Sequence, residues 1–480
     1  VGRVRARFGD TVAVLHSGLS PRARWTEWRR LLDGRARVAV GARSAVFAPV
    51  QRLRLLVVDE EHDAAYKQED GVRYHARDLA VVRARQVGGV CVLSSATPSA
   101  ESYQAARDGR HTLLELTTRP TGHPLPTVEV VDLRAQPKRR RDDQGQGPAF
   151  SERLHEALAN NLGAGGQTLV FLNRRGFATY LQCPACGATA SCPNCSVTLT
   201  FHRQRAALVC HHCHHAARPP ARCPECQGAA LEAFGGGTER IEENLQQLFP
   251  LAAVQRLDRD VANRPAAQTR ILAAWQKGTT DILVGTQMVS KGHDVPGVTL
   301  VVVLLADLSL NIPDFRAAER TFQLLVQVAG RAGRGATAGR VLLQTLRPDH
   351  PSVVAATTHD YHHFITGELA RREAMGYPPF ARLVSVRIDG PDNLVVESAA
   401  RELATALRAT AETLGLDART VMGPTTPPIE RLNNRYRWHV LLRSHDVPKL
   451  RQLARQARRA EAAMRSAKLH LVVDVDPQGL

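Results

Sequence analysis

The sequence contains no apolar run long enough to cross a membrane. A spanning helix needs about 20 apolar residues, and the longest apolar stretch, VTLVVVLLADLSL, is interrupted by Asp307. The N-terminal stretch VGRVRARFGD has no apolar segment after its basic residues, which excludes the pattern of a secretory signal peptide. We therefore expect no membrane partner.

Lysine and aromatic residues are scarce. Aromatic residues make up 5% of the chain, and only six of its 63 Lys and Arg residues are lysine. None of the six follows a glycine, so the given residues contain no G-x-x-x-x-G-K-[S/T] loop of the kind that wraps nucleotide phosphates. The chain also begins with Val1 rather than Met, and we expect it to be a fragment.

The net charge is strongly positive. It is +17 at pH 7, from 63 Lys and Arg residues against 46 Asp and Glu residues. A basic chain without a secretion signal usually binds a polyanion, and nucleic acid is the first candidate. The alternative is a genome that favours arginine codons, which the shortage of lysine also fits.

Cysteine is missing from most of the chain and concentrated in one block. Eight of the nine cysteines lie between Cys183 and Cys226, and the ninth, Cys91, lies in an apolar stretch and is predicted to be a core residue. The eight form four C-x-x-C pairs, a spacing that turns two thiolates toward one metal ion. Clustering in a chain without a secretory signal favours metal over disulfides. Because four thiolates complete a tetrahedral shell, we expect two structural Zn²⁺ sites.

The residues leave two pairings of the C-x-x-C motifs open. SVTLTFHRQRAALV, between the second and third motifs, alternates apolar and polar residues and is predicted to form a hairpin. A hairpin favours nested pairing, in which the inner motifs share one zinc and the outer motifs share the other. The alternative pairs the motifs in sequential order. In the nested arrangement zinc 1 is held by Cys183, Cys186, Cys223 and Cys226, and zinc 2 by Cys192, Cys195, Cys210 and Cys213.

Short apolar runs alternate with polar helical stretches in two regions. In residues 1–133 the runs DTVAVLHS, RLRLLVVDEE and GGVCVLSSATPS are near-continuously apolar, which fits a parallel sheet covered on both faces. Residues 134–150 are polar and rich in turn-forming residues, which indicates a linker. The alternation resumes in 151–182 and 227–346, so the cysteine block, 183–226, is predicted to be an insertion in a second α/β domain.

The remaining residues, 347–480, combine two alternating strand patterns, ARLVSVRIDG and RWHVLLRS, with a long helical stretch. They are predicted to form a small α+β domain. The predicted fold class is therefore α/β, with two layered domains, a Cys-rich insertion in the second, and an α+β domain after it.

Acidic residues end one predicted strand. Asp59 and Glu60 begin the motif DEEH, which suits a site where the first acid holds Mg²⁺ beside a nucleotide and the second orients the attacking water. SSATPS, Ser94–Ser99, ends the next strand, and its hydroxyl groups could relay between nucleotide and nucleic acid. Taken alone, each motif is equally a strand that ends in solvated side chains or a simple turn.

Two motifs in the second region add basic and glycine residues. QVAGRAGRG places Arg331 and Arg334 three residues apart on one helix face, where guanidinium groups could stabilise charge on a γ-phosphate. GTQMVSKGHDVPGV begins at another strand end, where its glycines allow close backbone approach.

In this order the motifs resemble those of superfamily 2 helicases, with DEEH as motif II, SSAT as motif III, GTQMVSKGHDVP as motif V and QVAGRAGR as motif VI. The inserted cysteines and three further motifs narrow the resemblance to one family. The motifs are YKQEDGVRYHARD at residues 66–78, FLNRRGF and GYPPF. Essentially the whole chain resembles the primosomal protein N′ (PriA) family of replication-restart DNA helicases. The resemblance implies two RecA-like lobes, the first incomplete at 1–133 and the second interrupted by the zinc insertion.

The resemblance also implies roles for matching residues. Asp59 and Glu60 are the expected Mg²⁺ and water carboxylates, and Arg331 and Arg334, with Gln327 nearby, are expected at the γ-phosphate. Nested zinc pairing is the family's arrangement. The residues expected to couple nucleotide to DNA are His62, Tyr66, Lys67, Tyr74, Arg77, Asp78, Ser95, Ala96, Thr97, Gly292 and Asp294.

The family unwinds DNA 3′ to 5′ at stalled forks with ATP and Mg²⁺ and helps to reload the replicative helicase. We therefore expect forked DNA with single-stranded/duplex junctions, primosome proteins and single-stranded-DNA-binding protein as partners. The resemblance further implies a monomer in the bacterial cytoplasm, a zinc module that supports unwinding and partner contacts, and a C-terminal domain that contributes to DNA binding.

The chain departs from the family at its start and in one loop. The phosphate loop and N-terminal DNA-binding domains have no counterpart in the given residues, and Val72 stands where a Trp is expected. If an ordinary helicase has been truncated, the parent protein hydrolyses ATP and this chain alone does not. The alternative is a non-hydrolysing DNA-binding scaffold for primosome assembly, which the intact DEEH and QVAGRAGRG motifs disfavour. A zinc-ribbon nucleic-acid-binding protein unrelated to helicases would leave the four ordered motifs unexplained.

Overall fold

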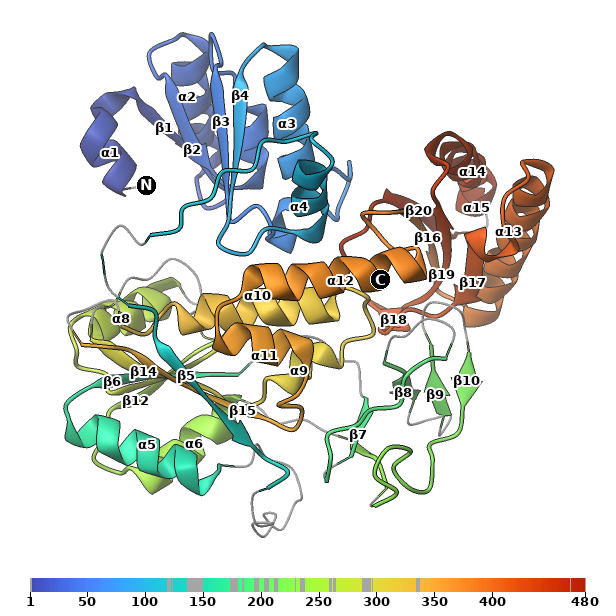
Figure 1. The fold of residues 1–480 in the computed structure, drawn as a ribbon. Coiled ribbons are helices and arrows are strands. Elements are labelled where there is room, and N and C mark those ends of the chain that lie inside the picture. Colours follow the sequence, from blue (N-terminus) through green and yellow to red (C-terminus); the bar gives the residue numbers. More distant parts are fainter. Residues whose placement is uncertain are drawn as a thin grey trace. The chain divides into compact units, whose positions relative to one another are not determined.

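The computed structural model forms two compact units (Figure 1). The first comprises Val1–His111 with Asp474–Gln478, and the second comprises Thr112–Val473 with Gly479–Leu480. Within the described residues, no helix combines the length and apolar character needed to cross a membrane. The structure describes residues 2–118, 122, 124–135, 150–172, 180–183, 185–193, 198–202, 207–210, 215–228, 230–233, 238–258, 261, 265–286, 295, 297–333, 337–466 and 468–479.

The first unit alternates strands with helices, as its apolar runs predict. Strand β1 pairs with β2 and β3 pairs with β4, both in parallel. The elements are α1 (Gly2–Phe8), η1 (Gly9–Thr11), β1 (Val12–Leu15), α2 (Pro21–Leu32), β2 (Val38–Gly41), η2 (Arg43–Phe47), β3 (Leu55–Asp59), η3 (Ala64–Tyr66), α3 (Ala76–Gln86), β4 (Val90–Ser94) and α4 (Ala100–Arg107).

Helix α2 begins at a strong local signal and covers β1. The Ser20 side chain accepts a hydrogen bond from the Ala23 backbone N–H, and Pro21 occupies the first helical turn, where its missing N–H costs nothing. One face of the helix packs Leu31 against Leu15 in a small core, with Trp28 partly buried beside it. The opposite face of α2 is open to solvent.

One face of the β3–β4 pair is more exposed than the sequence predicts. Leu55 lies opposite Val90, and Val57 lies opposite Val92, so the four side chains form one apolar strip. All four are exposed, and the predicted cover on both faces is wrong for this pair within the described residues. Cys91, which was predicted to be a core residue, is only partly buried.

The second unit contains a six-stranded parallel sheet in the order β12-β13-β6-β14-β15-β5. Its strands and covering helices are β5 (Thr127–Asp132), α5 (Glu152–Gly163), β6 (Gln167–Phe171), α6 (Thr238–Leu248), β12 (Val254–Leu257), α8 (Pro265–Gln276), β13 (Ile282–Gly285), β14 (Val298–Val303), α9 (Asp307–Leu310), α10 (Ala317–Ala329), β15 (Arg340–Thr345), α11 (Pro351–Thr357) and α12 (Tyr361–Met375).

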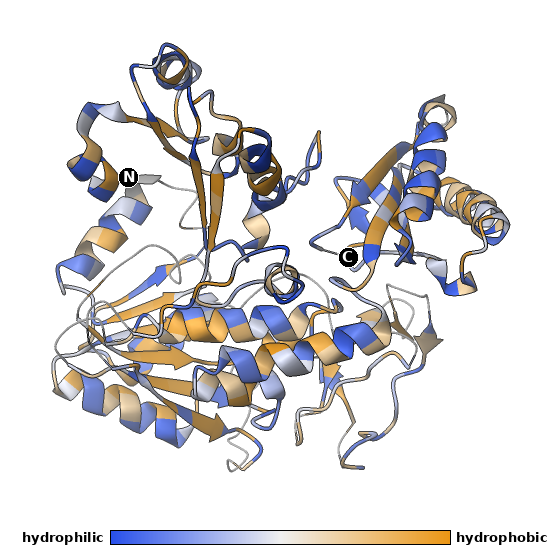
Figure 2. Ribbon diagram, turned by 45° about the horizontal axis from the view of Figure 1, so that its top comes forward, coloured by the Kyte–Doolittle hydropathy of each residue, from blue (hydrophilic) through white to orange (hydrophobic). Residues whose placement is uncertain are grey.

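Helices cover both faces of this sheet, as continuous apolar strands require. Side chains of α5 and α6 pack on one face, and those of α8, α10, α11 and α12 pack on the other. Figure 2 shows strands that are hydrophobic along their length between helices that are hydrophobic on one side only. This is the layered arrangement of a RecA-like helicase lobe.

Strand β5 joins the second unit, although the sequence predicts a domain that ends at residue 133. Thr127–Asp132 pairs in parallel with β15 across the whole strand, from Thr127 opposite Arg340 to Asp132 opposite Thr345. The units divide between His111 and Thr112. The division therefore precedes β5, whereas the predicted linker, 134–150, follows it.

The cysteine block contributes short antiparallel strands. The predicted hairpin is confirmed by β8 and β9, where Thr200 lies opposite Val209 and His202 lies opposite Ala207. Strand β10 pairs with β9, and β11 pairs with β7. The strands are β7 (Leu181–Gln182), β8 (Thr200–His202), β9 (Ala207–Val209), β10 (Ala216–Ala217) and β11 (Glu232–Ala233).

The C-terminal α+β domain has a five-stranded sheet with the order β17-β19-β16-β20, in which β18 also pairs with β19. Its long strand β19 is antiparallel to β16, β17 and β18. Side chains of α13 and α14 pack on the sheet in one core. The elements are β16 (Arg382–Gly390), α13 (Asn393–Thr413), η5 (Ala418–Thr420), β17 (Val421–Thr425), β18 (Arg431–Leu432), β19 (Arg435–Ser444), α14 (Val447–Arg459), α15 (Glu461–Ser466) and β20 (His470–Val475).

Candidate functional site

The acids of DEEH lie at the carboxyl edge of the β3–β4 pair. Asp59 ends β3 opposite Ser94, the last residue of β4. Glu60 follows with a left-handed backbone, φ 49°, and its N–H donates to Asp59 Oδ1 over 3.1 Å. Asp59 is exposed and Glu60 is partly exposed, so both carboxylates are open to a ligand.

A side-chain contact joins DEEH to SSAT. His62 Nδ1 lies 2.7 Å from Ser95 Oγ, and it also lies 3.6 Å from Glu60 Oε2. Ser95 Oγ in turn accepts a hydrogen bond from the backbone N–H of Thr97 over 2.9 Å. Thr97 is buried, whereas Ala96 between them is exposed. The two predicted motifs therefore form one cluster at the strand ends.

Glu61, the third acid of DEEH, has a role that sequence reasoning missed. Only 1% of Glu61 is exposed. Its Oε2 accepts hydrogen bonds from Arg77 Nη1 over 3.1 Å and from Ser102 Oγ over 2.8 Å, and its Oε1 accepts the Ser99 N–H over 2.6 Å. Arg77 also donates to Ser99 Oγ over 2.7 Å. This network holds together DEEH, the end of the 66–78 stretch and the start of α4.

The charge state of Arg77 is secured by its partners. Burial lowers the pKa of the Arg77 guanidinium, but the nearby carboxylates of Asp78 and Glu61 outweigh it, and the net shift is upward. Arg77 Nε donates to Asp78 Oδ1 over 2.9 Å. A buried cation with two anionic partners is a fixed element of the fold rather than a group free to contact a ligand.

The stretch 66–78 is anchored at its ends and exposed at its tip. Tyr66 Oη donates to the carbonyl of Asp59 over 2.6 Å, and Gln68 N–H donates to the carbonyl of Tyr74 over 2.8 Å. The Tyr74 ring packs edge-on against Phe47 with centroids 5.0 Å apart. Val72, where the family resemblance implies a Trp, is 82% exposed at the tip.

Two groups in this stretch titrate away from their usual range. Burial, together with the neighbouring carboxylates of Asp59 and Asp63, raises the pKa of Tyr66 to about 12. Burial lowers the pKa of His75 to about 4, assisted by the positive charge of Arg77. At neutral pH Tyr66 is therefore a phenol that donates its proton, and His75 is a neutral imidazole.

Lys67 is held away from solvent. It is 4% exposed, and its Nζ lies 2.8 Å from Asp474 Oδ1 and donates to the carbonyl of Val475 over 2.6 Å. Both partners come from the far end of the chain, whose last segment belongs to the first unit. The predicted coupling residue Lys67 is therefore engaged in an internal ion pair in this conformation.

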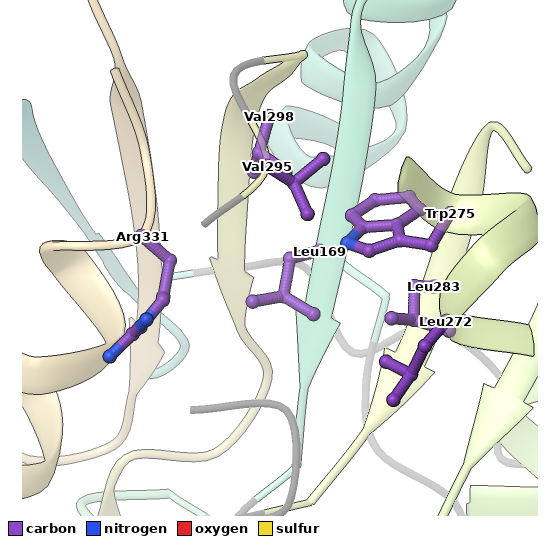
Figure 3. A pocket seen from close by; sticks show the side chains of 7 residues that line it. All are labelled: Leu169, Leu272, Trp275, Leu283, Val295, Val298 and Arg331. Carbon is purple, nitrogen blue, oxygen red and sulfur yellow. The ribbon is translucent and has the colours of Figure 1, made fainter. Parts of the chain in front are cut away.

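Gln327 lies near the end of α10, and Arg331 follows the helix by two residues. Gln327 is partly buried, and Arg331 borders a small pocket otherwise lined by apolar side chains (Figure 3). Figure 3 shows Arg331 on the opposite side of the pocket from Trp275 and Leu272. Of the other predicted nucleotide or coupling residues, Arg334, Gly292 and Asp294 lie outside the described residues.

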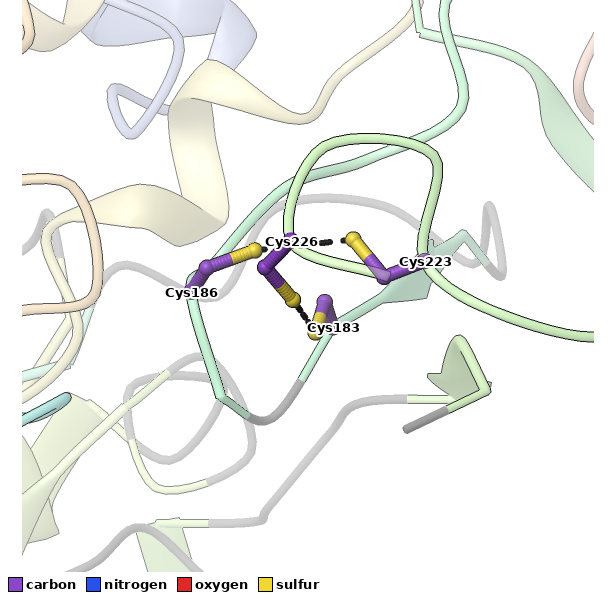
Figure 4. Close-up of side chains that lie close together, drawn as sticks. All are labelled: Cys183, Cys186, Cys223 and Cys226. Atoms are coloured by element: carbon purple, nitrogen blue, oxygen red, sulfur yellow. Dashed lines mark hydrogen bonds between the residues drawn. The ribbon is translucent and has the colours of Figure 1, made fainter. Parts of the chain in front are cut away.

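The four outer cysteines come together in space (Figure 4). The Sγ atoms of Cys183, Cys186, Cys223 and Cys226 lie within 4.8 Å of one another. Cys183 and Cys226 Sγ are 3.7 Å apart, and Cys186 and Cys223 Sγ are 3.5 Å apart. A tetrahedral zinc with Zn–S bonds of about 2.3 Å needs S–S edges of about 3.8 Å, so these thiols fit the ion. This is the grouping that nested pairing requires.

The inner set is described only in part. Cys192 and Cys210 are buried near the β8–β9 hairpin, and Cys195 and Cys213 lie outside the described residues. The backbone N–H of Cys210 donates to the carbonyl of His215 over 2.8 Å. Together the Cys-rich domain and the outer cluster indicate zinc binding.

Three family models match successive parts of the chain. The PriA DNA helicase Cys-rich region matches residues 192–218, and the helicase conserved C-terminal domain matches 237–336. The primosomal protein N C-terminal domain matches 373–478. The last match begins within α12, later than the predicted domain start at residue 347.

Curated relatives match nearly the whole chain. The replication restart protein PriA of Bacillus subtilis is 41% identical over 95% of this chain and 56% of its own length. That of Synechocystis is 40% identical over 99% of this chain and 57% of its own. The chain thus spans little more than half of these relatives. PriA of Treponema pallidum is 41% identical, with 99% of this chain and 70% of its own length covered. At this identity and coverage, and with the Cys-rich, helicase and C-terminal domains in one order, the chain belongs to the PriA family of replication restart proteins.

Proposed function

We propose that this chain is the core of an ATP-dependent 3′–5′ DNA helicase that acts in replication restart and primosome assembly at stalled forks. The observation that carries the proposal is the His62–Ser95 contact of 2.7 Å, which joins the acid motif to the hydroxyl motif at one sheet edge. A helicase needs such a link because hydrolysis must change the grip on DNA. Membership in the PriA family supports the same activity.

Each residue of the site has a task in this proposal. The exposed Asp59 carboxylate would hold Mg²⁺, a hard ion that prefers oxygen ligands, and Glu60 would orient the attacking water. Mg²⁺ supplies charge neutralisation on the phosphates. Arg331 and Arg334, with Gln327 nearby, would stabilise the charge that develops on the γ-phosphate. The phosphate loop has no counterpart in the given residues.

We assign the remaining coupling residues to two groups. His62, Ser95, Ala96 and Thr97 form the link at the strand ends. Tyr66, Lys67, Tyr74, Arg77 and Asp78 anchor the exposed tip around Val72, which would sense DNA. Gly292 and Asp294 would serve the second lobe by family resemblance.

The zinc ions are proposed as structural. Four thiolates close each shell and leave no position for substrate, so the two Zn²⁺ stabilise the insertion and take no part in hydrolysis. Zinc 1 would be held by Cys183, Cys186, Cys223 and Cys226, and zinc 2 by Cys192, Cys195, Cys210 and Cys213.

The proposed partners follow from the family. They are forked DNA with single-stranded/duplex junctions, primosome proteins and single-stranded-DNA-binding protein. The protein is proposed to bind them as a monomer in the bacterial cytoplasm. The charge of +17 supports a polyanionic partner, and binding should weaken as salt rises.

An ATPase assay with and without forked DNA tests the proposal. The chain should bind DNA but not hydrolyse ATP, whereas the protein extended upstream of Val1 to include a G-x-x-x-x-G-K-[S/T] loop should hydrolyse ATP only when DNA is present. The matched control is Glu60→Gln in the extended protein, which should bind DNA normally and lose turnover. An extended protein that contains the loop and remains inactive would favour the non-hydrolysing scaffold instead.

A further inference from the structure

Helix α2 presents an unusual aromatic side chain to solvent. Trp25 is 59% exposed, whereas Trp28 is partly buried and Trp275 and Trp438 are almost fully buried. The small core beneath α2 is filled from the other side of the helix by Trp28 and Leu31. Trp25 therefore contributes little to packing within the first unit.

Two arginines flank the exposed ring. Arg22 precedes Trp25 by three residues and Arg29 follows it by four, so all three share one helix face. The Arg29 guanidinium lies over the indole, 5.7 Å from the ring centroid. Its 4.0 Å contact with Asp33 joins two half-exposed side chains and adds little attraction.

The other arginines of α2 behave differently. Arg24 donates to the carbonyl of Ser17 over 3.3 Å, and Arg30 donates to the carbonyls of Val12 and Asp10. These two secure the helix to its own unit. The single acid of the helix, Glu27, is also used internally, because it accepts hydrogen bonds from the Val14 N–H and from Arg30. The Trp25 face is thus positive and carries no acid within the helix.

We propose that Arg22, Trp25 and Arg29 form a platform for single-stranded DNA, with a base stacked on the indole and backbone phosphates on the arginines. Arg22 and Arg29 are separated by about 10 Å along the helix axis, which suits phosphates on either side of one base. An exposed flat ring between cations is the arrangement used for sequence-independent binding of single strands. An acidic peptide would satisfy the arginines but leave the indole face without a flat partner.

The platform rests on the proposed function and adds to it a residue outside the helicase motifs. It predicts that the single strand crosses the solvent face of α2. Because Trp25 provides stacking and the arginines provide charge, measuring the affinity at several salt concentrations separates the two contributions. Removing one arginine that contacts a phosphate makes the slope of log affinity against log salt shallower by about 0.7 for a single strand. Removing a stacked ring leaves this slope unchanged.

The test uses this chain and a fluorescein-labelled oligothymidylate, with binding followed by anisotropy. Trp25→Ala should weaken binding about tenfold, equivalent to about 1.4 kcal/mol, at an unchanged salt slope. Trp25→Phe should retain most of the affinity, while Trp25→Leu should behave like Trp25→Ala. Arg22→Ala and Arg29→Ala should each lower the slope. Matched controls are Val82→Ala and Arg85→Ala on α3, which remove an exposed apolar group and an exposed cation.

A 5-iodouracil oligonucleotide gives a positional readout. Photocross-linking followed by peptide mapping should place the adduct on the α2 peptide that contains Trp25. If Trp25→Ala binds like Val82→Ala and the adduct lies elsewhere, the platform is refuted while the helicase proposal stands. If the unaltered chain fails to bind the oligonucleotide even at low salt, DNA binding by this chain fails and the platform fails with it.

Discussion

Arg77 donates a hydrogen bond across 3.1 Å to the carboxylate of Glu61, and both side chains are buried. Glu61 comes directly after the two acids proposed to act on the nucleotide, and Arg77 lies at the end of the 66–78 stretch, whose tip is proposed to sense DNA. The pair therefore fixes the base of the loop against the acid motif. It is a positioning contact, because neither side chain is open to a ligand.

Breaking this pair should loosen the first unit. Glu61→Gln leaves the Arg77 cation buried without its buried carboxylate partner, and removal of one member of a buried pair typically costs about 3–5 kcal/mol. Hydrogen exchange of peptides that cover residues 55–63 and 90–102 should report a loss of local stability in that range.

The control for this change is Glu69→Gln, which removes an exposed acid from the same loop and should stay within about 0.5 kcal/mol of the unaltered chain. Equal exchange rates in the two variants would mean that the Glu61 network does not hold the strand ends together. Arg77→Met provides an independent check from the other partner.

Gly187 should tolerate no side chain. Its φ is +74°, and an added Cβ would lie 2.5 Å from the carbonyl oxygen of Leu346. Gly278 has the same φ and no atom within 4 Å of such a Cβ, so Gly278→Ala isolates the backbone cost of about 1 kcal/mol. Gly187→Ala should cost at least about 2 kcal/mol more, measured by urea unfolding, because the backbone of Leu346 cannot move aside.

The same substitution should also reduce zinc content, since Gly187 directly follows Cys186 and its N–H donates to the Cys183 carbonyl over 2.9 Å. Normal zinc content together with normal stability in Gly187→Ala would contradict the docking of this loop on Leu346.

Metal analysis should find about two zinc ions per chain. Cys223→Ser should remove the ion of the outer cluster, because serine is a poor zinc ligand and the remaining three thiols leave the shell open. Cys192→Ser should remove the other ion. Cys91→Ser, outside the cluster, is the matched control and should keep both. A folded preparation with no zinc would contradict the assignment of these cysteines as zinc ligands.

Acid should weaken the start of α11. Burial lowers the pKa of His350 to about 4, helped by the charges of Arg347 and Arg371. Its Nδ1 accepts the Ser352 N–H over 3.2 Å as the helix cap, a role that only the neutral ring can fill. The unfolded chain takes up a proton below about pH 6.5 while the folded chain does not.

Stability should therefore fall as pH drops from about 6.5 toward 4, by about 1.6 kcal/mol between pH 6.5 and 5 for this group. His350→Asn keeps a capping acceptor without titrating, and its urea unfolding curve should lose that share of the pH dependence. His363→Asn, at an exposed position of α12, should not change it. A variant with the original pH dependence would show that His350 does not couple to folding.

Sequence reasoning reaches furthest where chemistry dictates spacing. The C-x-x-C motifs and the hairpin between them point to the outer group of four, since two turns must face one ion, and these thiols lie within 4.8 Å in the structure. The acids of DEEH and the hydroxyls of SSAT end neighbouring parallel strands, so their meeting at His62 and Ser95 follows from topology.

Sequence reasoning failed where the outcome depends on the direction in which a side chain points. Glu61 differs from its neighbours Asp59 and Glu60 only in pointing inward, and nothing in DEEH distinguishes it until Arg77 is found opposite. Likewise β5 has an ordinary apolar pattern, and only its pairing with β15 assigns it to the second unit. Trp25 and Trp28 lie in the same helical pattern, and burial alone separates a core residue from a surface one.

The ion pair between Lys67 and Asp474 has a consequence for biosynthesis. The Lys67 ammonium hydrogen-bonds to a carbonyl 408 residues later in the chain. During translation the first unit therefore waits for almost all of the second to be made before Lys67 meets its acceptor. Until then a cation destined for burial remains in water, and the loop that follows it lacks one of its anchors. The first unit thus leaves the ribosome before the second and reaches its final structure only after most of the second has been made.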